Sequence, residues 1–154
     1  MTPQEWTAFQ DALTPEQAAA LTVYGEAKNQ SVSGLQAVLS VIRNRVKVGR
    51  FGSGWKGVIF KPWQFSCWNE GDPNRAQLLQ LGFQLIGKTE RTQNAVFDVC
   101  VWLAAQMVEG KYLSNVSDST HYYAPAIVDT PAWAKSPAVR RTVVGSHVFY
   151  GNVR

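Results

Sequence analysis

The sequence predicts a single α+β domain that is mainly helical and ends in a small antiparallel β element. Hydrophobic residues make up 45% of the 154 residues and charged residues only 17%, which suits a compact core and is too little charge for a disordered chain. The first two thirds of the chain carry helix caps and apolar residues at helical spacing, whereas the last third carries prolines and short β-rich runs. No uninterrupted apolar stretch reaches the roughly 18 residues of a membrane span.

The first helix is predicted by a capping box. Thr14 supplies an N-cap hydroxyl, Pro15 occupies the first helical position, and Gln17 follows three residues after the cap. The alanine-rich run behind this start continues to about Lys28. We therefore expect a helix over residues 14–28.

The second helix starts with a similar signal at Ser33-Gly34-Leu35-Gln36. Its apolar residues are spaced by three and four positions and so follow one face of a helix: Leu35, Val38, Leu39, Ile42 and Val46. Glycines then interrupt the period, and the stretch up to Asp72 is aromatic without periodicity. That composition predicts a long ordered loop with short extended pieces.

Two more helices are predicted, one from Asp72-Pro73 to Gly87 and one from Thr92 to Gly110, which makes four in all. Prolines 125, 131 and 137 exclude long helices after Ser114. Residues 141–144 and 147–150 are typical of two short strands around a Gly145-Ser146 turn.

Charge and cysteine content narrow the function only slightly. A net charge of +4 suits a polyanionic partner, either nucleic acid or a bacterial envelope, without choosing between them. Cys67 and Cys100 are too few for a disulfide scaffold, and the sequence does not say whether they pair. Two histidines without a zinc motif lead us to expect no metal and no other cofactor. Residues 1–6 lack the features of a secretory signal, so we expect synthesis in the cytoplasm without a signal peptide.

Glu26 is the first candidate for chemistry. It follows Tyr24 and Gly25 near the end of the first predicted helix, and a helical glycine is costly unless a ligand or another part of the chain approaches closely. A carboxyl group shielded from water keeps its proton more readily, as a general acid toward a glycosidic oxygen requires. The alternative is that Glu26 has no chemical role and is a solvent-exposed carboxylate on the helix surface, beside Lys28.

Two aromatic segments are candidates for ligand binding. Residues 60–68 interleave rings with amides and hydroxyls, as sugar binding demands, and we place Gln64 and Phe65 in a cleft wall and Phe60 in the core. The alternative is that the whole segment packs as core. In His121-Tyr122-Tyr123, the tyrosines cannot both face the core if the segment is extended, and His121 is either a proton carrier or a structural histidine.

Two alternatives of other classes stay open at this point. Cys67 with His121 would be the minimum for an amidase or endopeptidase that cuts peptide stems. Cys100 falls on the apolar stripe of its helix, so we expect it in the hydrophobic core. A non-catalytic module that binds cell wall or nucleic acid through the aromatic segment and the positive charge is the other alternative.

Several motifs occur together in an order that resembles the SleB-type bacterial cell-wall hydrolases, a family of spore-cortex-lytic enzymes and phage lysins. The resemblance covers about residues 15–150, and its landmarks are Tyr24-Gly25-Glu26-Ala27, residues 41–46, residues 57–66, residues 121–125 and residues 145–150. It implies a lysozyme-like fold related to lytic transglycosylases. It also implies a catalytic domain over residues 14–154, preceded by an N-terminal extension over residues 1–13.

The resemblance further implies that Glu26 is the catalytic acid and base on peptidoglycan, at the β-1,4 bond between N-acetylmuramic acid and N-acetylglucosamine. We expect substrate contacts from Tyr24, Asn44, Gln64, Phe65, Ser66, His121, Tyr122 and Tyr123. A lytic transglycosylase needs one carboxyl group, which protonates the leaving oxygen and then activates the muramoyl 6-hydroxyl to leave a 1,6-anhydro end. A hydrolytic muramidase would need a second acid, for which Glu70, Asp72, Asp118 and Asp129 are the candidates.

The implied setting is a phage or bacterial lysin that reaches the cell wall after holin-assisted release or as part of a virion. The expected partner is the peptidoglycan glycan strand, with no nucleic acid, no membrane span and a monomeric state.

Overall fold

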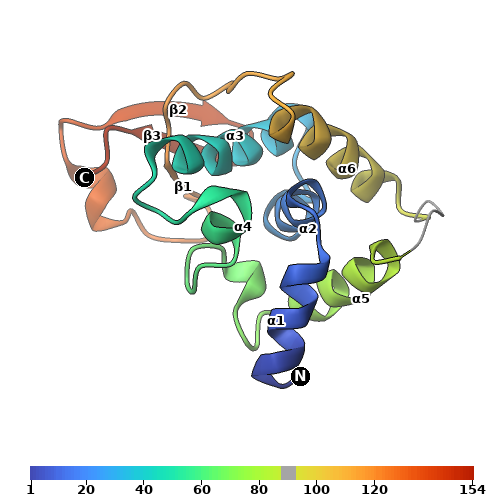
Figure 1. Ribbon diagram of the computed structural model, residues 1–154. Coiled ribbons are helices and arrows are strands. Elements are labelled where there is room, and N and C mark those ends of the chain that lie inside the picture. Colours follow the sequence, from blue (N-terminus) through green and yellow to red (C-terminus); the bar gives the residue numbers. More distant parts are fainter. Residues whose placement is uncertain (88–92) are drawn as a thin grey trace.

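A computed structural model describes residues 1–87 and 93–154 and confirms the mainly helical α+β class (Figure 1). Within these residues the α-helices are α1 (Pro3–Ala12), α2 (Pro15–Ala27), α3 (Val32–Val48), α4 (Gly54–Ile59), α5 (Arg75–Leu85) and α6 (Ala95–Val108). The 3₁₀ helices are η1 (Ser66–Trp68) and η2 (Ala132–Lys135), and the strands are β1 (His121–Tyr123), β2 (Arg140–Val144) and β3 (His147–Gly151).

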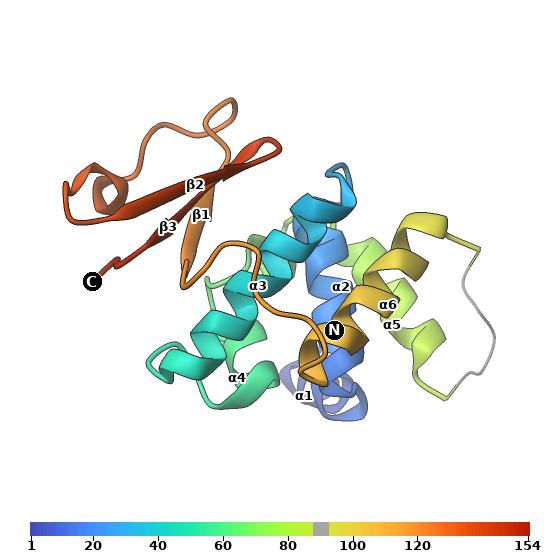
Figure 2. The ribbon, with the colours of Figure 1, turned by 90° about the horizontal axis from the view of Figure 1, so that it is seen from above.

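Helix α2 lies in the middle of the helical part, with the other helices around it (Figures 1 and 2). Its residues 18–24 are buried on every side, which its alanines permit because their small side chains let neighbouring helices approach. The predicted capping box is present: the Thr14 hydroxyl accepts from the Gln17 N–H at 3.1 Å, and Gln17 Oε1 accepts from the Thr14 N–H at 2.9 Å. The start of this central helix is therefore fixed by its own cap.

The other three predicted helices are α3, α5 and α6, with small shifts at their starts. Helix α3 is capped by Ser31 rather than Ser33 and ends at Gly49, whose φ of 83° only glycine adopts readily. Helix α5 starts at Arg75 because Asp72 Oδ1 accepts from the Asn74 N–H at 2.8 Å in a turn that precedes it. Asn94 caps α6, and the expected start at Thr92 lies outside the described residues.

Helix α1 was not predicted, although its cap repeats that of α2. Thr2, Pro3 and Glu5 form the same capping box. The helix packs on the rest of the chain through Phe9, which is buried and fills the space left by Gly82 of α5. Lys56 of α4 also donates to carbonyl groups at the C-terminal end of α1, including Gln10 O at 2.8 Å. Residues 1–13 are thus tied to the same core as α2.

The segment expected to be an aromatic loop contains α4 and η1. Helix α4 has six residues, two of them glycine, and its N-cap makes no side-chain hydrogen bond, so its local signals are weak. Val58 and Ile59 are fully buried at its end, and packing of α4 against α2 and α3 stabilises it. Tertiary burial therefore outweighs the helix-breaking composition that predicted a loop.

The three strands form an antiparallel sheet in the order β1-β3-β2. The predicted hairpin is confirmed: β2 pairs with β3 through a turn at Gly145, which has a φ of 57°. Strand β1 adds an unpredicted third strand on the free edge of β3 and places Tyr122 opposite Phe149. The sheet lies to one side of the helices with α3 between it and α2 (Figure 2), and no α-helix follows Val108 in residues 109–154.

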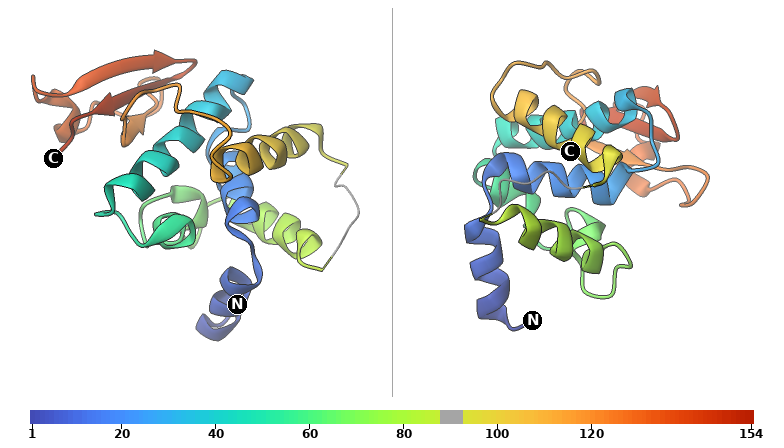
Figure 3. Two further views of the ribbon diagram at one scale, coloured as in Figure 1. Left: turned by 45° about the horizontal axis from the view of Figure 1, so that its top comes forward. Right: turned by 90° about the vertical axis from the view of Figure 1, so that its right-hand side faces the viewer.

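The chain termini lie at separate places on the surface (Figure 3). Over residues 1–87 and 93–154, no helix combines the length and the apolar character that crossing a bilayer requires.

Candidate functional site

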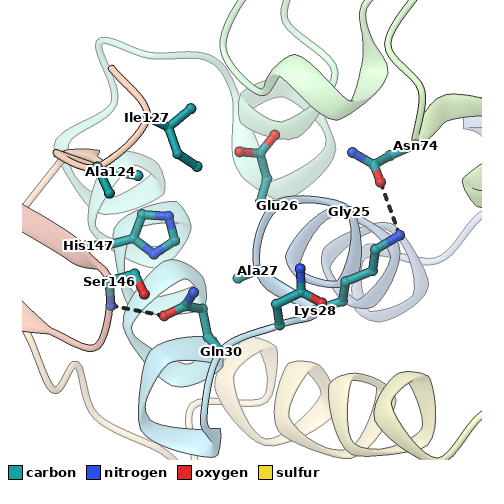
Figure 4. A pocket seen from close by; sticks show the side chains of 12 residues that line it. Gly25, Glu26, Ala27, Lys28, Gln30, Asn74, Ala124, Ile127, Ser146 and His147 are labelled. Atoms are coloured by element: carbon teal, nitrogen blue, oxygen red, sulfur yellow. Dashed lines mark hydrogen bonds between the residues drawn. The ribbon is translucent and has the colours of Figure 1, made fainter. Parts of the chain in front are cut away.

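A cleft of about 460 Å³ lies beside the C-terminal end of α2 (Figure 4). One wall is the end of α2 and the turn after it, and Asn74 ahead of α5 completes that side. The opposite wall comes from the segment after β1 and from the β2–β3 turn. The lining residues are Gly25, Glu26, Ala27, Lys28, Asn29, Gln30, Asn74, Ala124, Ala126, Ile127, Ser146 and His147.

Glu26 is half-buried in this cleft, and both of its carboxyl oxygens are held. Oε2 accepts from the Tyr122 hydroxyl at 2.9 Å, and Oε1 accepts from the Cys67 backbone N–H at 3.0 Å and from the Ser66 hydroxyl at 3.3 Å. Lys28, the partner in the solvated-carboxylate alternative, instead donates to Asn74 Oδ1 at 3.0 Å. The contacts of Glu26 are those of a carboxyl group held in one orientation rather than of a solvated helix side chain.

Side chains from other parts of the fold approach Gly25 closely, as its place inside a helix predicted. A Cβ at this position would lie 2.7 Å from Leu78 Cδ1 and 2.8 Å from Cys67 Cβ. The missing side chain therefore allows residues 66–67 to come close enough to α2 to donate to Glu26.

Tyr122 is the donor from the other side of the cleft. Its pKa is raised well above the usual value by burial and by the negative charge of Glu26, so the hydroxyl keeps its proton. A phenolic hydroxyl donates to a carboxylate and accepts from a carboxylic acid, so this contact can persist in both protonation states of Glu26.

His147 is a cleft residue that lies within the 145–150 landmark but was not among the expected substrate contacts. Its ring lies edge-on to that of Tyr122, with centroids 5.2 Å apart, and Nδ1 is a buried atom without a hydrogen-bond partner in the described structure. Burial lowers its pKa, partly opposed by Glu26, so the imidazole is neutral near pH 7. A usable signal was its position directly after the predicted Gly145-Ser146 turn, which Gln30 anchors by accepting from the Ser146 N–H at 3.1 Å.

Arg45 joins the two segments that carry the donors to Glu26. Its Nε donates to Thr120 O at 2.7 Å, next to β1, and its Nη1 donates to Gln64 Oε1 at 3.3 Å, ahead of η1. The guanidinium also lies over the rings of Phe51 and Phe65, at 5.0 and 5.1 Å. This buried cation therefore helps to hold the two donor-carrying segments in place relative to each other.

Tyr24 and Asn44 are expected site residues that point elsewhere. Tyr24 precedes Glu26 by two positions, which turns its side chain by about 200° around α2, and its hydroxyl accepts from Asn94 Nδ2 at 2.8 Å. Asn44 donates to Ser117 O and Ser119 O, both at 2.9 Å, and so holds the segment before β1. Both side chains serve the fold around the cleft rather than lining it.

The residues of the 60–68 segment have different places in the structure, and only some of them are near the cleft. Ser66 reaches Glu26, whereas Gln64 binds Arg45 and Phe65 is buried beneath that guanidinium rather than standing in the wall of this cleft. Phe60 packs against the core, as expected.

The residues of β1 alternate as a strand requires. Tyr122 faces Glu26, whereas His121 packs against Phe51 and Trp133, and the Tyr123 hydroxyl contacts Thr130 at 3.3 Å. The pKa of His121 is lowered to about 4 by burial and by the positive charges of Arg45 and Arg50, which is unsuited to a proton carrier near neutral pH.

Cys67 does not have the environment of a nucleophile. Its side chain is 1% exposed, Sγ faces Thr22 O at 3.9 Å, and its pKa is raised by burial and by Glu26. Cys100 is buried as well, with its pKa raised to about 12 by burial, and both cysteines are free. The contacts of Cys67 thus argue against the Cys67–His121 amidase alternative.

None of the four candidates for a second carboxylate lines the cleft: Glu70, Asp72, Asp118 and Asp129. Asp118 pairs with Arg140, Asp72 accepts from the Asn74 N–H, and Glu70 is 93% exposed near Arg75. Among the described residues that line the cleft, Glu26 is the only acidic one.

The model of the cell wall hydrolase family matches residues 29–150 of this chain, a match that begins just after Glu26. Two solved structures are similar in fold. The catalytic domain of the germination-specific lytic transglycosylase SleB from Bacillus anthracis has a TM-score of 0.61 and 22% identity over 89% of this chain and 93% of that one. The catalytic domain of the Bacillus cereus SleB protein has a TM-score of 0.64 and 23% identity over 89% of both chains. No curated protein has a sequence that matches this chain significantly.

Proposed function

The chain belongs to the cell wall hydrolase family and is an enzyme that cleaves peptidoglycan, and we propose that it is a lytic transglycosylase with Glu26 as its one catalytic carboxyl group. The bond cleaved is the β-1,4 link from N-acetylmuramic acid to N-acetylglucosamine. One observation carries the proposal: Glu26 is held through both oxygens in a cleft whose described lining has no other acidic residue.

In the first step Glu26 is protonated and gives its proton to the glycosidic oxygen as the bond to the anomeric carbon breaks. The Ser66 hydroxyl and the Cys67 N–H aim the carboxyl group, and the carboxylate that forms gains a donated hydrogen bond from Tyr122. The released N-acetylglucosamine keeps the proton.

In the second step the Glu26 carboxylate takes the proton from the muramoyl 6-hydroxyl, whose oxygen bonds to the anomeric carbon. The product is a 1,6-anhydro end, and no water is consumed. The single acid returns to its protonated form, so a second carboxylate is unnecessary. Neutral His147, in the facing wall, is suited to bind a hydroxyl or acetamido group of the sugar.

Product analysis tests this reaction. Purified sacculi digested with the protein should release muropeptides that are one water lighter than species with reducing ends, as shown by mass spectrometry. Reducing ends alone would mean a hydrolytic muramidase, and new amino groups without glycan cleavage would mean an amidase. Either result would overturn the transglycosylase.

The role as a phage or bacterial lysin, and the route to the wall through a holin or a virion, stay predictions from the sequence.

A further inference from the structure

Trp63 combines an exposed ring with an unfavourable backbone conformation. The indole is 83% exposed, and the residue has a φ of 67° in the left-handed region, which suits glycine rather than a large side chain. It occupies the third position of a turn that the Gln64 N–H closes on Lys61 O at 3.2 Å. The backbone conformation costs stability, and the exposed ring adds little packing to offset that cost. This combination is typical of a residue that serves recognition.

Trp63 lines a second pocket, of about 360 Å³, which we call the tryptophan pocket. The base of this pocket is a cluster of rings, in which Trp6 and Phe60 have centroids 5.6 Å apart and Phe60 and Trp68 have centroids 5.2 Å apart. Polar groups surround the rings: Lys61, Asn69, Glu70 and Arg75. Exposed apolar ring surface with donors and acceptors at its rim suits a pyranose ring, which has an apolar face and hydroxyls at its edge.

One short segment of chain carries both donors to Glu26 and residues of the tryptophan pocket. Ser66 and the Cys67 N–H bind Glu26, while their chain neighbours Phe65 and Trp68 line the tryptophan pocket. Further along the same segment, Asn69 and Glu70 line the pocket, whereas Asn74 lines the cleft. The segment from Phe65 to Asn74 therefore contributes residues to both the pocket and the cleft.

We propose that the tryptophan pocket is a second, non-catalytic glycan site, in which Trp63 stacks on a sugar ring of the strand that Glu26 cleaves. The polar rim binds the hydroxyl and acetamido groups of that sugar. This proposal rests on the proposed function for the identity of the glycan. The pocket holds long strands near the cleft and does not touch the reacting atoms.

Binding without cleavage is the direct test. In the Glu26→Gln background, Trp63→Gly should raise the apparent Kd for purified sacculi by about tenfold in co-sedimentation, the effect of losing one aromatic anchor. Glycine also relieves the left-handed backbone, so the Tm should stay equal or rise. Trp102→Ala is the matched control because Trp102 is also exposed, at 53%, but lies on α6 outside both sites. The control should bind like the parent.

A second measurement uses oligomers of N-acetylglucosamine. Titration should change the indole fluorescence of the Glu26→Gln protein, and Trp63→Gly should remove that change. Unaltered binding in both assays would overturn the proposal, as would a loss of binding that follows a loss of fold. Loss of self-association in Trp63→Gly, seen by sedimentation velocity without any change in glycan binding, would also overturn it in favour of a contact between copies of the chain.

The two proposals fail separately. If the wild-type protein yields anhydro products and Trp63→Gly binds normally, only the tryptophan pocket is refuted. If the wild-type protein yields no anhydro products while Trp63→Gly still weakens glycan binding, the transglycosylase is refuted and the pocket stands.

Discussion

The hydroxyl of Tyr122 lies 2.9 Å from Oε2 of Glu26, although 96 positions separate these residues in the chain. The pair joins the end of the central helix α2 to strand β1, and thus the helical part of the molecule to the sheet. Because the phenol can donate or accept, it is compatible with a carboxyl group that alternates between acid and base.

Glu26→Gln should lower the release of soluble wall fragments by about 10²- to 10⁴-fold, since the amide cannot transfer the proton. Its size is nearly that of the acid, so circular dichroism and Tm should match the wild type. Glu109→Gln, which lies at the end of α6 and lines neither the cleft nor the tryptophan pocket, is the control and should keep full activity. Wild-type turnover in Glu26→Gln would refute the assignment.

Tyr122→Phe should lower kcat by about 10- to 100-fold with a small change in KM, because a hydrogen bond to a charged group is worth about 1.5–3 kcal/mol. Tyr123→Phe is matched to it, since this neighbour lies on the other face of β1 and contacts Thr130. Equal kinetics of the two variants on purified sacculi would contradict the role of Tyr122.

Gly25→Ala should destabilise the protein by about 1–3 kcal/mol, because the new methyl group collides with Cys67 and Leu78. Activity should fall further than stability explains, since residues 66–67 must shift away from Glu26. Gly57→Ala is the control, because a Cβ there would lie 3.7 Å from its nearest atoms, which is an ordinary van der Waals distance. Urea unfolding and wall-lysis assays measure both effects, and similar values for the two variants would contradict the close-approach argument.

Cys67→Ala should keep glycan-cleaving activity, because the thiol is buried with a raised pKa and the substitution leaves the backbone N–H that donates to Glu26 in place. Iodoacetamide should leave Cys67 unmodified in the folded protein and alkylate it in urea, as peptide mass mapping would show. Loss of activity in a variant with unchanged Tm would revive the cysteine-dependent alternative.

Stability should fall as the pH drops from about 6.5 toward 4. The folded pKa of His121 is lowered from 6.5 to about 4, so the unfolded chain binds more protons in that window and is favoured there. The His147 pKa is lowered too, with the same sign. His121→Gln should therefore lose less Tm than the wild type between pH 6.5 and 4. If the two proteins lose the same Tm over this pH range, His121 is not the origin of the acid sensitivity.

Local signals explain what could be predicted of the fold. Caps and apolar stripes lie within a few residues of one another, so the helices α2, α3, α5 and α6 and the β2–β3 hairpin follow from the sequence. Helix α1 could also have been predicted, since Thr2-Pro3-Gln4-Glu5 carries the same capping box as Thr14-Pro15-Glu16-Gln17. Helix α4 could not be predicted from local signals, because burial of its end against distant helices stabilises it.

Local patterns in the chain are enough for the fold class, the family resemblance and the candidate acid, because Glu26 lies in a short motif and the helix that carries it has its own cap. The groups that contact this acid depend on packing between distant parts of the chain. This packing brought in Tyr122, His147 and the Cys67 N–H, and it turned Tyr24 and Asn44 away. The reason is physical: helix periodicity and capping depend on neighbours in the chain, whereas a cleft is made by side chains that packing brings together from far apart.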